Sequence, residues 1–160
     1  MLPEFERMDE AERDGLVEEN VGARCGRGRR YHWRYEMAGP VVRKLESKSH
    51  DSADEVRTPS KTRVEVVRLE GFTIGRLSME PGWRWSECVK PVVGTETCQV
   101  SHVGYMVSGQ LVVRLEDGTE QTISAGQSYT IPPGHDAWNS SSEKFVCIEV
   151  LSADVFAKPA

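Results

Sequence analysis

Two cysteines and two histidines in the C-terminal part of the chain carry side chains that bind transition metals. They are Cys88, Cys98, His102 and His135. Thiolate sulfur and imidazole nitrogen suit Zn(II) and other borderline metals better than Mg or Ca, which prefer oxygen ligands. We therefore expect any bound metal to be one divalent ion, with Zn favoured over Fe, Mn or Ni. The alternative is that each cysteine is a small buried hydrophobe and each histidine a hydrogen-bonded core residue.

The spacing of Cys98 and His102 limits what the two residues can do together. Side chains alternate along a β-strand, so both would point to the same face, together with Met106. A regular strand rises about 3.3 Å per residue, which places the two residues about 13 Å apart. That distance is too long for one ion. A shared site therefore requires a bulge or a bend between them.

Aromatic and charged residues close to these four in the sequence predict a ligand pocket. The tryptophans are dense for so short a region, and pockets for small organic molecules are mostly apolar and aromatic with a few polar groups. Core packing or a dimer contact would explain the tryptophans equally well, and exposed charge would explain the lysine. The predicted pocket residues are Trp83, Trp85, Lys90, Glu96, Tyr105, Met106 and Trp138.

Short segments rich in Val, Ile, Thr and aromatic residues follow Thr62 and predict β-strands. Asp117-Gly118 favours a type I′ hairpin turn, because both residues readily adopt positive φ. Many short strands with tight turns predict a closed β-sandwich or barrel, because closure removes exposed edges. The predicted strands are 63–69, 72–79, 83–88, 98–107, 110–116, 120–124, 128–131 and 145–151.

Two segments of this region resemble the two sequence motifs of the cupin family. Six residues separate His102 from Gly109, which matches the end of the first motif. The segment GQSYTIPPG, from Gly126 to Gly134, matches the start of the second. The resemblance covers about residues 64 to 151. It implies an all-β fold, the cupin-type double-stranded β-helix or jelly-roll barrel.

The chain departs from the cupin pattern at the positions that hold metal in that family. In the first motif, His102 stands where the family has a metal-binding Glu, and no His-x-His precedes it. Counting forward from Gly82, taken as the first glycine of the motif, places Cys88 and Lys90 at the two histidine positions. Counting back from His102 places Glu96 and Cys98 there. The resemblance leaves both registers open.

The second motif differs as well. His135 directly follows Gly134, and Ala137 occupies the place where the family histidine usually falls. The usual site of three histidines and one glutamate is therefore not implied. The resemblance instead leaves His102 and His135 as the candidates for holding an ion or exchanging protons near neutral pH.

The rest of the chain sets limits on compartment and partners. A net charge of −5 and the absence of a long apolar run argue against nucleic acid and membrane as partners. The acidic N-terminus does not resemble a secretory signal, so we expect a cytoplasmic protein with reduced cysteines. Residues 1–62 are predicted to be an irregular or weakly helical N-terminal arm and polar linker, 63–152 the barrel, and 153–160 a C-terminal tail.

These patterns support three functions. The first is a small cupin that binds a small molecule in its barrel, with or without a metal ion. The second is a metal-dependent cupin enzyme of the dioxygenase, isomerase or decarboxylase class. The third is a structural, dimerising cupin with a vestigial pocket. In each case we expect a homodimer.

Overall fold

The computed structural model describes residues 42–158. Most of the predicted N-terminal arm lies outside this range. No helix among the described residues is long and apolar enough to cross a membrane.

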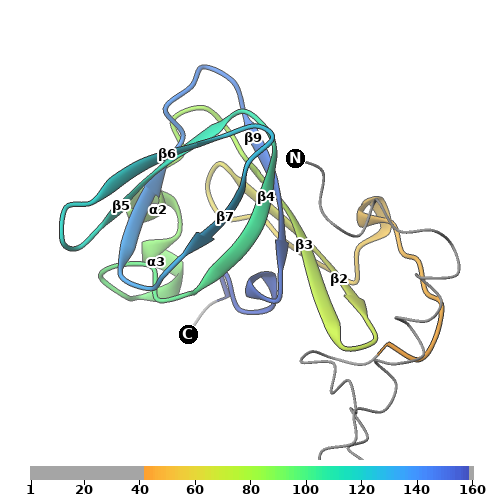
Figure 1. Cartoon of the computed structure of the whole chain (residues 1–160). Coiled ribbons are helices and arrows are strands. Elements are labelled where there is room, and N and C mark those ends of the chain that lie inside the picture. The colour runs from red at the N-terminus through yellow and green to blue at the C-terminus, as the bar shows by residue number, and fades with distance from the viewer. Residues whose placement is uncertain (1–41, 159–160) are drawn as a thin grey trace, which may run out of the picture. The chain divides into compact units, whose positions relative to one another are not determined.

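Two antiparallel sheets form the described part of the chain (Figure 1). The larger has the strand order β1-β2-β3-β9-β4-β7, and the smaller has the order β6-β5-β8. The strands are β1 (Glu55–Arg57), β2 (Thr62–Leu69), β3 (Phe72–Met79), β4 (His102–Ser108), β5 (Gln110–Leu115), β6 (Glu120–Ser124), β7 (Ser128–Ile131), β8 (His135–Trp138) and β9 (Phe145–Val150). The predicted all-β class and its cupin-type two-sheet architecture are confirmed.

Alternating burial along the strands explains how the sheets enclose one core. On β9, Phe145, Cys147 and Glu149 are buried, and the residues between them are only half-buried. On β4, His102 and Met106 are buried, whereas the intervening side chains are exposed. This is the period of two that a sheet with one covered face requires. The inward face of β4 is the one predicted from the sequence.

The region predicted to form a strand over 83–88 is instead helical. It contains a single turn, α2 (Trp85–Cys88), followed by a second, α3 (Lys90–Val93). The side chain of Asp136 accepts hydrogen bonds from the backbone N–H and hydroxyl of Ser86, which fixes the first turn to strand β8. Gly94 ends the second turn with φ of 72°, a conformation that glycine adopts without strain. The strand prediction for 83–88 was therefore wrong. It rested on residue types alone, whereas hydrogen bonds to Asp136 on another strand hold this segment as a helical turn.

Two short strands were not predicted. β1 lies in the segment predicted to be a polar linker and pairs with β2 along the edge of the larger sheet. β8 consists of HDAW and pairs with β5. Both are too short for alternation to be recognisable in the sequence. The 3-10 turn η2 (His50–Ser52) lies in the same linker.

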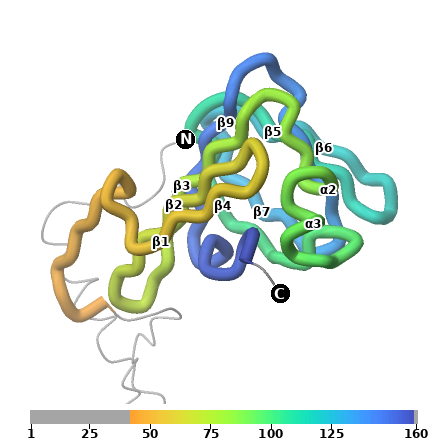
Figure 2. Tube along the Cα trace, turned by 180° about the vertical axis from the view of Figure 1, so that it is seen from behind, coloured from red at the N-terminus to blue at the C-terminus, as the bar shows by residue number. Residues whose placement is uncertain are grey.

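The segment after residue 152, predicted to be a tail, packs into the core. It contains the 3-10 turn η3 (Ser152–Asp154), and Ala153 and Phe156 are buried. The guanidinium of Arg57 donates hydrogen bonds to the carbonyls of Ala153 and Phe156. Gly75 on β3 makes room for this turn, since a Cβ there would lie 2.2 Å from that of Ala153. Figure 2 shows the turn against β2 and β3.

Replacing Phe156 by alanine should therefore destabilise the protein. The ring is 3% exposed, and removing it leaves a cavity that should lower the free energy of unfolding by about 3 kcal/mol. Val155→Ala is the matched control, because Val155 is 56% exposed and should change that free energy by less than about 0.5 kcal/mol. Urea unfolding measures both. Equal values for the two variants would show that the segment is not part of the core.

Candidate metal site and cavity

Cys98, His102 and His135 converge on one point inside the barrel. One ligand atom from each lies within 4.8 Å of the others, and all three residues are buried. The Sγ of Cys98 is 3.5 Å from Nε2 of His102. The imidazole rings of His102 and His135 meet edge to face, with centroids 5.2 Å apart. Three of the four predicted metal ligands are thus brought together.

A bend in the chain resolves the spacing problem of Cys98 and His102. Strand β4 begins only at His102, and Cys98 instead forms an isolated bridge with His135. The N–H of Cys98 donates to the carbonyl of His135 at 2.9 Å, and the N–H of Gly134 donates to the carbonyl of Cys98 at 2.8 Å. Because the strand is interrupted, the thiol turns toward the histidine four residues later. The same backbone pairing holds His135 beside Cys98.

Hydrogen bonds to Nδ1 fix the tautomer of each histidine. Nδ1 of His135 lies 2.6 Å from the carbonyl oxygen of Pro132, which can only accept, so Nδ1 carries the proton. Nδ1 of His102 lies 2.7 Å from Oε2 of Glu149 and donates to that carboxylate. When such a ring is neutral, the lone pair is therefore left on Nε2. This is the arrangement in which histidines bind metal ions.

Glu149 is the residue of the site that the sequence analysis missed. Its carboxylate is 4% exposed and accepts three hydrogen bonds, from His102, from the hydroxyl of Tyr129 at 3.0 Å and from that of Ser152 at 2.6 Å. The signal that could have identified it is its position in FVCIEV, where it shares the buried face of Phe145 and Cys147. A buried charged residue in an apolar strand requires partners.

The charges of the site are strongly coupled. Burial opposes ionisation of the Cys98 thiol, but hydrogen bonds from His102 and His135 lower its pKa to about 6. Burial likewise disfavours the imidazolium of His102, yet the Glu149 carboxylate raises its pKa to about 10. For Glu149, burial is outweighed by the charge of His102, which lowers the pKa. Cys147 is different, because burial raises its pKa and keeps it a neutral thiol.

The separation of the Cys98 and His102 ligand atoms fits a tetrahedral ion. Bonds of about 2.3 Å to sulfur and about 2.0 to 2.1 Å to nitrogen, at the tetrahedral angle, place the two ligand atoms about 3.5 Å apart. Cys98 and His102 have this separation. Three protein ligands leave a fourth position open. These residues therefore fit a zinc-type ion.

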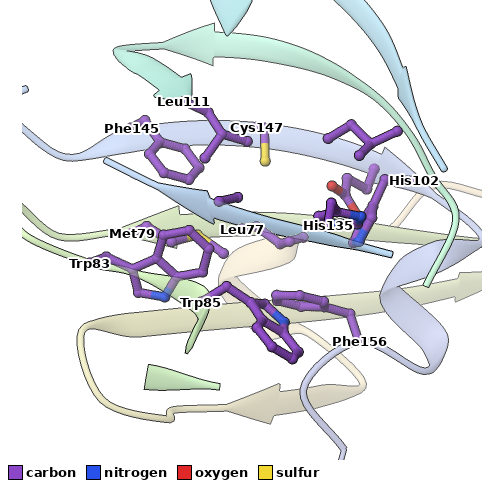
Figure 3. Close-up of a pocket in the computed structure, with 13 residues that line it drawn as sticks. Leu77, Met79, Trp83, Trp85, His102, Leu111, His135, Phe145, Cys147 and Phe156 are labelled. Carbon is purple, nitrogen blue, oxygen red and sulfur yellow. The ribbon is translucent and has the colours of Figure 1, made fainter. Parts of the chain in front are cut away.

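An apolar cavity adjoins the group. It encloses about 30 Å³, well below the range of pockets that hold drug-sized molecules. His102 and His135 form part of its wall, and Figure 3 shows both beside Leu77 and Phe156. The other lining residues are Met79, Trp83, Trp85, Leu111, Ile131, Ala137, Phe145, Cys147 and Glu149.

The remaining predicted site residues lie elsewhere. Cys88 is buried in α2 but is not in the metal-binding group. The two tryptophans Trp83 and Trp85 line the cavity. Tyr105, Lys90 and Glu96 were predicted to line the pocket but do not. Tyr105 is 47% exposed on the outward face of β4. Lys90 forms an ion pair with the exposed Glu96.

Two further predicted pocket residues also lie outside the cavity lining. Met106 is fully buried in the core between the sheets. The ring of Trp138 lies between the guanidinium groups of Arg84 and Arg114, 4.7 and 5.1 Å from its centroid. Cation–π contacts of this kind account for Trp138 without a ligand.

Similarity to a solved structure with a TM-score of 0.51 agrees with this architecture at the level of fold. No family model and no curated protein matches the chain. A Rhizobium leguminosarum protein of unknown function is 25% identical, with a TM-score of 0.51 over 68% of this chain and 96% of that chain. An RmlC-like cupin from Shewanella frigidimarina is 16% identical, with a TM-score of 0.46 over 67% of this chain and 89% of that chain. The polyketide cyclase RemF from Streptomyces resistomycificus is 13% identical, with a TM-score of 0.49 over 67% and 78%.

Replacing His102 by alanine should destabilise the metal-free protein by about 3 kcal/mol, because the Glu149 carboxylate would lose its charged partner while remaining buried. His135→Ala is the matched control. Its partner is a neutral carbonyl, so we expect a loss of only about 1 kcal/mol. Urea unfolding in the presence of a chelator gives both values.

A double variant separates the charge effect from simple loss of packing. Combining His102→Ala with Glu149→Gln should cost less than the sum of the two single substitutions, because the unpaired charge is removed as well. Additive costs, or a His102→Ala variant as stable as His135→Ala, would contradict the pairing.

Proposed function

We propose that this cupin-type protein binds one divalent metal ion, Zn first, through Cys98, His102 and His135, and holds a small molecule in the adjoining cavity. The observation that carries the proposal is the convergence of three buried ligand atoms, one from each residue, within 4.8 Å of one another. The hydrogen bond from Nδ1 of His102 to Glu149 orients the ring so that Nε2 faces the sulfur of Cys98. Packing alone would not require this orientation. Sulfur and nitrogen donors in tetrahedral geometry favour Zn over Mg or Ca.

The balance of charge supports the same proposal. A divalent cation would be matched by the Cys98 thiolate and the Glu149 carboxylate, one negative charge each, with both histidines neutral. Buried charges are tolerated when they are compensated within hydrogen-bonding or coordination distance. Glu149 would then act through His102 as its orienting partner, an arrangement common around metal-bound histidines.

Metal analysis of the untagged protein tests this proposal. We expect about one equivalent of zinc per chain and its loss in Cys98→Ala, because one of three protein ligands is removed. Cys88→Ala is the matched control, since Cys88 is also a buried cysteine but lies outside the group, and it should retain the metal. Isothermal titration of the chelated protein with Zn gives the affinity. Unchanged binding by Cys98→Ala, or no binding by the unmodified chain, would overturn the site.

A metal-dependent enzyme is the second candidate. It is favoured by one observation, that both histidines form part of the cavity wall, so the open ligand position would face bound molecules. A metal ion in such a position supplies a Lewis acid or an activated water. His102, Glu149 and Tyr129 would hold the site rigid, and the apolar wall would exclude bulk water.

Cobalt substitution separates the two candidates. In an enzyme the fourth ligand position is exchangeable, so azide should alter the visible spectrum of the Co(II) protein. A site closed to exogenous ligands would leave the spectrum unchanged and would favour binding without turnover. The Cys88→Ala protein, which should retain the metal site, serves as the control that Co(II) occupies that site.

A further inference from the structure

The C-terminal turn contributes one aromatic ring to the wall of the cavity. Most of the wall comes from β-strands, whereas Phe156 follows η3 and is 3% exposed. Its ring meets the imidazole of His102 edge to face, with centroids 5.4 Å apart. Figure 3 shows the other phenylalanine of the wall, Phe145, farther from both histidines. Phe156 therefore borders the end of the cavity that carries the candidate metal ligands.

The space beside this ring is small. It encloses about 30 Å³, and a single buried water needs roughly 10 to 15 Å³. The cavity therefore has room for about two water-sized groups. A molecule larger than that can reach the histidines only if part of the wall is removed or displaced.

The turn that carries Phe156 is held from the β1 side by a charged residue. The guanidinium of Arg57 donates hydrogen bonds to the carbonyls of Ala153 and Phe156. Its Nε donates to the carboxylate of Glu55, which holds the guanidinium in place. These charge-assisted hydrogen bonds anchor the backbone on which the ring is mounted.

The turn is also held from the side of the candidate metal site. Ser152 donates its hydroxyl to Oε2 of Glu149, the same oxygen that accepts from His102. Leu151 and Ala157, on either side of the turn, have φ of 68° and 56°. Residues other than glycine keep such a backbone conformation only where surrounding contacts impose it. The ring cannot move aside without breaking these contacts.

We propose that Phe156 is the specificity-determining residue of the candidate metal group. Its ring limits the molecules that reach the open ligand position to about two or three non-hydrogen atoms and excludes cyclic ones. This inference rests on the proposed function, because the open position exists only if Cys98, His102 and His135 hold an ion.

The experiment titrates the Co(II) protein with azide and with tetrazolate and follows the visible spectrum. Both probes are monoanions that bind metal ions through nitrogen, but azide is linear and tetrazolate is a five-membered ring. The unmodified protein should bind azide and exclude tetrazolate. Phe156→Ala should bind tetrazolate at least about tenfold more tightly than the unmodified protein does, because a group that overfills a packed site is penalised by about that factor. Its azide affinity should change by less than about twofold, because azide already fits.

Two further variants control for folding and for position. Phe156→Leu keeps an apolar side chain in the core and should show the same gain for tetrazolate to a smaller extent, so the test holds if the alanine variant does not fold. Phe145→Ala is the matched control, because Phe145 is also a buried phenylalanine of the wall but lies farther from the histidines. It should still exclude tetrazolate.

A second readout needs no metal. In chelated Phe156→Ala, benzene should occupy the space that the ring leaves, since a dry apolar cavity of that size binds it. Nuclear Overhauser contacts should then join the benzene protons to the ring protons of His102, which the Phe156 ring contacts in the unmodified protein. The unmodified protein should show no such contacts.

The outcomes separate this inference from the proposed metal site. Tetrazolate binding by the unmodified protein as tight as azide binding, no gain in either Phe156 variant, or an equal gain in Phe145→Ala would overturn the role of Phe156. Azide binding by none of the proteins would overturn the open position and this inference together. A protein that takes up no metal, but in which benzene contacts His102 only in Phe156→Ala, would refute the metal site and leave Phe156 as the residue that limits the size of the cavity.

Discussion

The hydrogen bond between His102 and Glu149 is the constraint on which the site depends. Glu149 lies on β9, between β3 and β4 in the larger sheet, so its carboxylate is held by main-chain pairing on both sides. A carboxylate at that depth must be compensated, and the donors come from β4, β7 and η3. One buried charge thereby links three strands and the C-terminal turn and sets the orientation of the imidazole.

The two histidines reach the same geometry by different means. His102 is oriented by a charged partner, whereas His135 is oriented by the carbonyl of Pro132, three residues earlier in its own chain segment. The backbone bridge between Cys98 and His135 then joins β8 of the smaller sheet to the segment that leads into β4 of the larger one. Consequently the three candidate ligand atoms are preorganised by packing and hydrogen bonds.

The cavity combines this polar end with an apolar wall. Water-poor surroundings strengthen electrostatic interactions, so the ion pair of His102 and Glu149 is stronger there than it would be on the surface. The same surroundings make unpaired polar groups costly, which is why the Glu149 carboxylate needs its three donors. The expected homodimer and cytoplasmic location stay predictions.

The sequence by itself determined the fold class and much of the site. The alternation within 128–131 and the Asp117-Gly118 turn before 120–124 are local properties, so these strands were predicted with their observed limits. The predicted type I′ geometry of the turn was wrong, because only Gly118 has positive φ. Residue types nominated Cys98, His102 and His135 as ligands. Only the tertiary structure decided that Cys88 lies in a helical turn outside the group, that the tail packs as core and that Glu149 orients His102. These features depend on contacts between residues far apart in the chain, and spacing along one strand cannot encode a bend that a distant partner strand imposes.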